Sequence, residues 1–139
     1  MAEGRWLGTQ APVDRAERAQ RWRAAIDDPR QAMLVAVQDG RVLGHLGLEV
    51  ATYGVASLGM AVTGADRGRG VGGALLAEAI ATARRLGAHK VALQVWPHNA
   101  AALGLYRKFG FVEEGRLRRH YRRRSGELWD AVVMGLPLD

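Results

Sequence analysis

A loop crowded with glycine and arginine separates an uncharged run from an apolar helical pattern. The run contains Leu58, Met60 and Val62, the loop covers residues 64–70, and the helical pattern begins at Val71. The first N–H groups of a helix have no partner within the helix, and the peptide dipoles favour negative charge there. Glycine lets a phosphate approach the main chain because no Cβ intervenes. The segment therefore predicts a ligand that carries phosphate.

Two common phosphate-binding motifs fit this loop poorly. Gly68, Gly70 and Gly73 satisfy the dinucleotide pattern G-x-G-x-x-G, but that pattern also needs an acidic residue at the end of the next strand, where this chain has Gln94. A P-loop needs lysine followed by serine or threonine after its last glycine, and here Ala74 follows.

Two other motifs resemble signatures of the GCN5-related N-acetyltransferase (GNAT) family. Arg67-x-x-Gly70-x-Gly72 resembles the family's acetyl-CoA signature, which has Gln or Arg first and Gly or Ala last. Residues 99–111, NAAALGLYRKFGF, resemble the family's N-x-x-A-x-x-x-Y-x-x-x-G-F signature. Two matches in the right order are far more specific than either alone.

The resemblance implies that acetyl-CoA is the co-substrate and lies between the third and fourth expected strands. The backbone of the third strand would hydrogen-bond the pantetheine arm, and an N–H near Val62 would stabilise the oxyanion. The loop would surround the pyrophosphate with N–H donors, and Arg67 or Arg69 would add charge-assisted bonds. The implied cofactor-binding residues are Met60, Ala61, Val62, Arg67, Gly68, Arg69, Gly70, Val71, Gly72, Gly73 and Asn99.

Asn99 and Tyr106 are seven residues apart, about two turns along one expected helix, so they share a face. The resemblance implies that Asn99 bonds CoA and that Tyr106 protonates the departing thiolate. A tyrosine with a pKa of about 10 and a thiol with a pKa of about 8.5 are close enough for this transfer. The plainer alternatives are a helix cap for Asn99 and a packed aromatic ring for Tyr106.

The general base is left open by the residues. An amine must be neutral to attack a thioester, so some group has to accept its proton. Several relatives place a glutamate on the fourth strand, and the matching Gln94 cannot act as a base. The alternatives are an ordered water chain or one of four side chains: Glu49, His98, His120 and Asp130. Glu49 and Asp130 are carried forward as candidate catalytic residues beside Tyr106.

Hydrophobic periodicity and turn residues predict the elements that position these groups. A helix crossing between the third and fourth strands implies one parallel pair in a mostly antiparallel sheet. The resemblance implies the GNAT acyl-CoA N-acyltransferase fold, of the α/β (α+β) class, with the family's first strand either short (residues 5–9) or missing. The expected helices are residues 13–27, 70–86 and 99–108, and the expected strands are residues 33–37, 42–50, 55–63, 90–96, 111–121 and 128–136.

Length and composition favour one domain over residues 1–139. The chain lacks cysteine, so it has no thiolate nucleophile or thiolate metal site, and no metal is expected. No apolar leader or membrane-length apolar run is present, so we expect a cytoplasmic protein without a membrane partner. The net charge is +6, and a dense arginine run, residues 116–124, is expected to be mostly solvated.

These features predict an N-acetyltransferase that moves an acetyl group from acetyl-CoA to a primary amine by direct attack. The amine belongs either to a small molecule or to a protein N-terminus or lysine, and a homodimer is allowed. Two alternatives are a non-catalytic acyl-CoA-binding module and an RNA- or ribosome-associated protein that uses the arginine-rich hairpin. Because stacking aromatics other than Tyr121 are lacking in that run, nucleic acid is the less favoured partner.

Overall fold

The computed structural model describes residues 28–64 and 70–139. Three predicted features lie outside these residues: the helix at 13–27, the short strand at 5–9, and the loop residues Arg67, Gly68 and Arg69. The described elements, in chain order, are β1 (Gln31–Gln38), β2 (Arg41–Val50), β3 (Val55–Val62), α2 (Val71–Arg85), β4 (Lys90–Val95), α3 (Ala100–Lys108), β5 (Val112–Arg122) and β6 (Leu128–Pro137).

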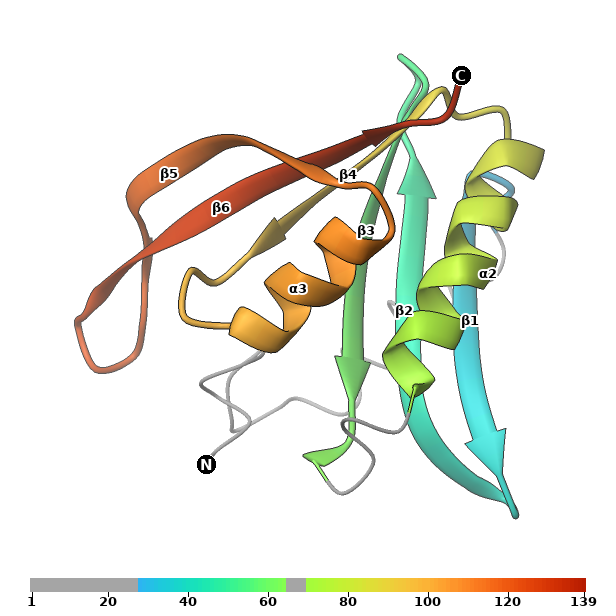
Figure 1. Ribbon diagram of the computed structural model, residues 1–139, viewed down its shortest axis with the longest axis horizontal. Helices are drawn as coiled ribbons and strands as arrows, with labels where there is room; N and C mark the ends of the chain where they lie inside the picture. Colours follow the sequence, from blue (N-terminus) through green and yellow to red (C-terminus); the bar gives the residue numbers. More distant parts are fainter. Residues whose placement is uncertain (1–27, 65–69) are drawn as a thin grey trace.

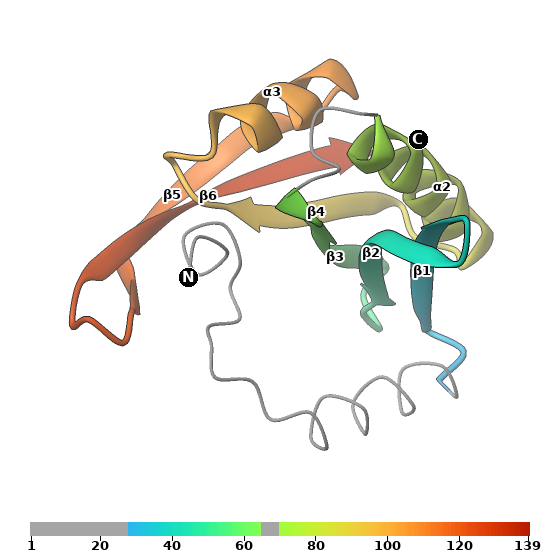
Figure 2. The same cartoon turned by 90° about the horizontal axis from the view of Figure 1, so that it is seen from below.

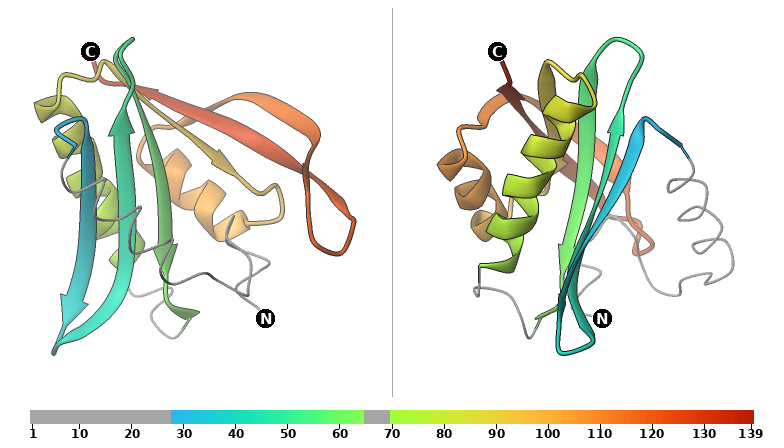
Figure 3. Two further views of the ribbon diagram at one scale, coloured as in Figure 1. Left: turned by 180° about the vertical axis from the view of Figure 1, so that it is seen from behind. Right: turned by 90° about the vertical axis from the view of Figure 1, so that its right-hand side faces the viewer.

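The six described strands form one sheet in the order β1-β2-β3-β4-β6-β5 (Figure 1). Every neighbouring pair is antiparallel except β3 and β4, which are parallel because α2 crosses between them. Helices α2 and α3 cover the same face of the sheet (Figures 2 and 3). The predicted mixed, mostly antiparallel α/β fold is confirmed.

The first three strands form a meander whose turns were readable from the sequence. Asp39 and Gly40 join β1 to β2 with φ of 52° and 75°, and positive φ at both central residues defines the tight turn that suits twisted strands. Gly54, with φ of 84°, closes the turn between β2 and β3, where its N–H donates to the Ala51 carbonyl. The predicted Asp-Gly hairpin is confirmed.

The parallel contact between β3 and β4 is short. It consists of Val55 opposite Lys90, Ala56 opposite Val91, and Ser57 opposite Ala92. Beyond that last pair the two strands diverge, and Figure 1 shows them as the two sides of a wedge. The divergence therefore begins within β4, after Ala92.

The core lies between the sheet and its two helices. Alternate residues of β2, β4 and β6 face α2 and α3, because successive side chains of a strand point to opposite faces. In α2 the apolar residues recur at helical spacing and turn inward. The most deeply buried side chains of this cluster are Leu46, Ala56, Leu76, Ala79, Ala83, Val91, Phe111 and Met134.

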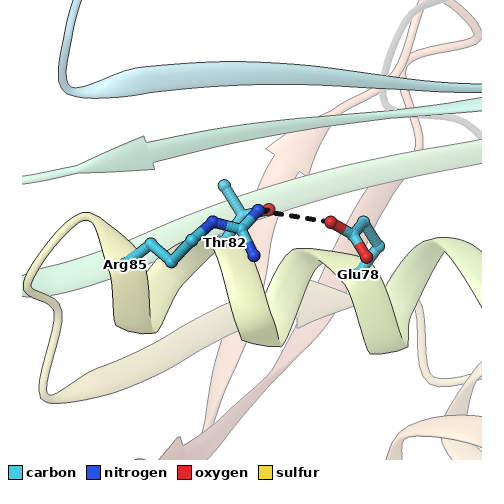
Figure 4. Close-up of polar contacts among 3 residues, drawn as sticks. All are labelled: Glu78, Thr82 and Arg85. Carbon is cyan, nitrogen blue, oxygen red and sulfur yellow. Dashed lines mark hydrogen bonds and ion pairs between the residues drawn. The ribbon is translucent and has the colours of Figure 1, made fainter.

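Three side chains of α2 form polar contacts with one another (Figure 4). Arg85 donates to Glu78 at 3.2 Å and to the Thr82 hydroxyl at 2.9 Å. The Arg85 and Glu78 side chains are 63% and 59% exposed, so water screens the pair and its contribution is below about 1 kcal/mol. None of the helices described is long and apolar enough to cross a membrane.

Strand β5 departs from the regular strand that the sequence predicts for residues 111–121. Its pairing with β6 shifts register twice, between Glu113 and Gly115 and between Leu117 and Tyr121. Arg119 has φ of 51°, and Asp130 stabilises this conformation because its carboxylate accepts the Arg119 N–H at 2.7 Å. The β5–β6 hairpin consequently bends, and it extends beyond the rest of the sheet (Figure 1).

Candidate active site

The N-terminus of α2 is suited to an anion. Gly70 caps the helix in the left-handed conformation, with φ of 81°, and among the described residues no side chain caps the first turn. That turn contains no acidic residue, so nothing there competes with or repels a phosphate. The N–H groups of Val71, Gly72 and Gly73 have no partner within the helix. The described part of the predicted phosphate site therefore fits the pyrophosphate of acetyl-CoA.

Gly72 also brings α2 close to its neighbours. A Cβ built on Gly72 would lie 3.2 Å from Leu105 Cδ2 and 3.6 Å from Met60 Cε. One residue on, a Cβ on Gly73 would lie 3.8 Å from Leu105 Cδ1. A side chain at position 72 would push α2 away from both β3 and α3, so this glycine serves packing as well as ligand approach.

The edge of β3 that faces β4 is open over residues 58–62. On its other edge β3 is paired along its full length, from Val50 opposite Ala56 to Gly44 opposite Val62. Its described pairing with β4 ends at Ser57. Backbone groups along this edge, including those of Met60, Ala61 and Val62, are therefore placed where a pantetheine chain could bind as an added strand would.

The register beyond the parallel pair shows which residues border the opening on the face away from the helices. Ser57 lies opposite Ala92, and residues two further along each strand point to the same face. Gly59 is thus level with Gln94, and Ala61 with Trp96. The β3 residues on this border, Gly59 and Ala61, are small. On the β4 side, Gln94 accepts a short hydrogen bond from the Tyr121 hydroxyl of β5.

Tyr106 lies on α3, and Asn99 is the N-cap of that helix. The Asn99 side-chain oxygen accepts the Ala102 N–H at 3.1 Å and caps the helix, leaving its amide NH₂ as the group that could donate to a ligand. Tyr106 is 6% exposed and packs on Phe111 with ring centroids 5.6 Å apart. Burial raises the pKa of Tyr106 to about 12, because ionisation would place a charge where water is excluded.

The two candidate carboxylates lie on opposite faces of the sheet. Glu49 is exposed on β2 and sits across from Ser57, so by strand alternation it shares the face of Gln94. Asp130 accepts the Arg119 N–H and the Arg116 Nε–H, both at 2.7 Å. The Arg119 bond and then the Arg116 bond hold the pKa of Asp130 below its usual value, which makes it a weaker base.

An aromatic cluster around Arg123 was not anticipated from the sequence. The expectation that the arginine run is mostly solvated fails at Arg123, which is 6% exposed. Its guanidinium lies 4.9 Å from the Trp96 ring centroid and 4.5 Å from that of Trp129. The Trp96 ring also meets Tyr121 edge-on at 5.3 Å. The only sequence signal was three aromatic residues spread over three elements.

The two histidines considered as bases both stand beside this cluster. His98 packs edge-on against Trp129 at 5.0 Å, and His120 packs against Tyr121 at 4.9 Å. Both are exposed. In the described ranges no three histidine, aspartate or glutamate side chains group as metal ligands would.

Comparison with known proteins identifies the class to which this fold and site belong. The model of the acetyltransferase (GNAT) family matches residues 3–111. An L-amino acid N-acetyltransferase of Escherichia coli is 37% identical over 113 residues, covering 78% of this chain and 69% of that protein. A Bacillus subtilis protein is 28% identical, covering 82% of this chain and 74% of that protein, and is named as a putative ribosomal protein bS18 alanine N-acetyltransferase.

Solved structures agree with this assignment. A ribosomal-protein-alanine N-acetyltransferase from Brucella melitensis superimposes with a TM-score of 0.83 at 30% identity, covering 91% of this chain and 80% of that one. A Salmonella typhimurium protein named as a putative acetyltransferase, solved with acetyl-CoA, shares the fold, with a TM-score of 0.85 at 24% identity and coverage of 96% of this chain and 79% of that one. The chain belongs to the GNAT family. It is an acetyl-CoA-dependent N-acetyltransferase, as the two motifs predicted.

Proposed function

We propose that this enzyme acetylates a primary amine by direct attack at the opening between β3 and β4, without an acetyl-enzyme intermediate. The observation that carries the proposal is the divergence of the two strands after Ser57 and Ala92, next to the N-terminus of α2, where the Gly70 cap provides no side-chain acceptor. The chain contains no cysteine, which removes the most reactive side-chain nucleophile for a covalent route.

The residues that would hold acetyl-CoA are those predicted. The N–H groups of Gly70, Val71, Gly72 and Gly73, together with Arg67, Gly68 and Arg69 of the preceding loop, would bind the pyrophosphate. Backbone groups of Met60, Ala61 and Val62 would bind the pantetheine, and Asn99 would donate through its amide. Acetyl-CoA supplies a thioester, the activated acyl group of the reaction.

The chemical step forms one bond and breaks one. The amine nitrogen bonds to the acetyl carbon, and the electron pair of the carbon–sulphur bond leaves with the thiolate. An N–H of β3 near Val62 stabilises the oxyanion. Tyr106 gives its proton to the thiolate, and a base accepts the proton that the amine loses. Atoms and charges balance once the base releases its proton to solvent and the tyrosinate takes one up.

Glu49 and Asp130 are the proposed bases, and the structure gives reasons to test Glu49 first. Glu49 shares the face on which Gln94 borders the opening. Asp130 lies on the other face by strand alternation, and each of its two carboxylate oxygens already accepts a hydrogen bond. A carboxylate whose pKa lies below the usual value accepts an amine proton less readily.

The acceptor is either a small amine or the N-terminus or a lysine of a protein. Relatives support both classes, since one is named for L-amino acids and others for the alanine of a ribosomal protein. We further propose that residues 1–139 form one domain, that the enzyme works in the cytoplasm, and that it can form a homodimer.

Free-thiol release from acetyl-CoA, followed with a panel of acceptors, tests the proposal. The panel comprises free amino acids, peptides with an unblocked N-terminus, and N-blocked peptides that contain lysine. One class is expected to release thiol in a one-to-one ratio with acetylated amine measured by mass spectrometry. Thiol release without any acetylated amine, across all three classes, would contradict amine transfer at this site.

A further inference from the structure

The positive charge of this chain is concentrated in one segment. Residues 116–126, here named the arginine arm, contain six arginines and no acidic residue. The other 14 basic residues of the chain equal its 14 acidic residues, so the whole net charge of +6 corresponds to this arm.

Three of the six arginines of the arm are exposed and lie outside ion-pair distance of any carboxylate in the described residues. Arg116 forms a salt bridge with Asp130 at 2.7 Å. Within residues 28–64 and 70–139, the side chains of Arg118, Arg119 and Arg122 are exposed and no carboxylate lies within ion-pair distance of them. At about 3.3 Å per residue the arm's strand portion extends over roughly 25 Å, far longer than a single amino acid.

The arm is joined to the border of the acceptor opening. The Tyr121 hydroxyl donates to Gln94 of β4, which lies where β3 and β4 have diverged. The Arg123 guanidinium covers the rings of Trp96 and Trp129, and cation–π contact in a water-poor site holds the hairpin against the end of β4. The charged segment is therefore held in place beside the site rather than left to move independently.

We propose that the arginine arm is a docking surface for an acidic polypeptide segment that flanks the amine to be acetylated. This inference rests on the function proposed above and narrows the acceptor to proteins or peptides with carboxylates near the modified amine. A small acceptor could contact only a fraction of the arm. An extended acidic chain could contact all of it while its amine enters between β3 and β4.

Nucleic acid fits the same charge less well. Binding of single strands uses aromatic faces on which bases stack. The Tyr121 and Trp129 rings of this hairpin already pack edge to face against Trp96. Arg123 covers the faces of Trp96 and Trp129. Trp96 is only 8% exposed. Charge without a stacking surface favours carboxylates over bases.

The test compares peptides of one length and one N-terminal sequence whose following residues are either glutamates or glutamines. Binding is measured by fluorescence anisotropy, and acetylation is measured as kcat and KM. Because an exposed ion pair is worth roughly a factor of two to five, three of them predict that the acidic peptide binds about tenfold to about a hundredfold more tightly. The gain is expected in KM and not in kcat, and added salt is expected to reduce it.

The variant Arg118→Gln, Arg119→Gln, Arg122→Gln is expected to remove this preference. The control Arg30→Gln, Arg85→Gln, Arg107→Gln makes the same charge change at exposed positions on other elements and is expected to retain it. Both variants are expected to keep the wild-type KM for acetyl-CoA and the wild-type kcat on the neutral peptide.

Any of three results would overturn the proposal that the arm is a docking surface. The wild-type protein could bind the two peptides with equal affinity, the arm variant could keep the preference for the acidic peptide, or the control variant could lose that preference to the same extent. Displacement of the acidic peptide by RNA at lower concentration than by free acidic peptide would assign the arm to nucleic acid instead. Anisotropy measures peptide binding without turnover. A failure of the proposed acetylation is therefore distinguished from a failure of the arm to bind acidic peptides.

Discussion

Replacing Tyr106 by phenylalanine removes one hydroxyl from a ring that is 6% exposed, and two quantities are expected to change. The first is turnover. A positioned general acid contributes about 10²–10⁴-fold, so kcat for amine acetylation should fall by at least about 100-fold in Tyr106→Phe. The KM for acetyl-CoA should change little, because the pyrophosphate and pantetheine contacts are unaltered. Thiol release under saturating acceptor measures both.

The second quantity is stability at high pH. Burial raises the pKa of Tyr106 to about 12, whereas in the unfolded chain the value is about 10. Between these values the unfolded chain loses the proton and the folded chain keeps it, so stability falls as pH rises. A pKa difference of two units, at 1.36 kcal/mol per unit, corresponds to about 2.7 kcal/mol of the free energy of unfolding. This contribution is present below pH 10 and is lost between pH 10 and 12.

Urea unfolding across this pH range separates the two contributions of the hydroxyl. The Tyr106→Phe protein should lack the part of the alkaline destabilisation that Tyr106 causes. Tyr53→Phe is the matched control, since Tyr53 is 74% exposed and its replacement should leave both kcat and the alkaline slope unchanged. An unchanged kcat in Tyr106→Phe with an active amine would refute the acid role even if the stability prediction holds.

Two further predictions concern packing and the base. Gly72→Val should raise the KM for acetyl-CoA and lower the free energy of unfolding by about 1–3 kcal/mol, because its Cβ would meet Leu105 at 3.2 Å. Gly104→Ala, at a helical position with no atom within 4 Å of the new Cβ, should instead raise the free energy of unfolding, measured in urea, by about 0.5–1 kcal/mol. Glu49→Gln should lower kcat and remove the acidic limb of its pH profile. Asp130→Asn should leave that limb in place and reduce the loss of stability on acidification through the lowered pKa of Asp130; the opposite pattern would assign the base to Asp130.

Much of the fold could be predicted because its signals are local. Asp39-Gly40 requires positive φ at two successive residues, and only a few residue types tolerate it. Asn99 caps α3 through the Ala102 N–H three residues on. The parallel pair followed from a helical pattern between two strands. Each of these depends on residues close together in the sequence, where spacing alone carries the information.

The features that could not be predicted depend on contacts across the sheet. Gln94 and Tyr121 are 27 residues apart, and their hydrogen bond follows from the order β4-β6-β5 together with a register shift in β5. Arg123 looked like one of several solvated arginines, because nothing in its neighbours shows that Trp96 and Trp129 would enclose it. The sequence alone does not distinguish the buried arginine of this run from its exposed neighbours.

The bulges of β5 have a consequence for how copies of this molecule meet. β5 is the last strand of the sheet, and an unprotected last strand invites another chain to extend the sheet. Two register shifts break the regular row of donors and acceptors, and arginines of like charge would face one another across any such junction. This border of the described sheet is therefore unfavourable for strand pairing between two copies, and the proposed homodimer is expected to form through another surface.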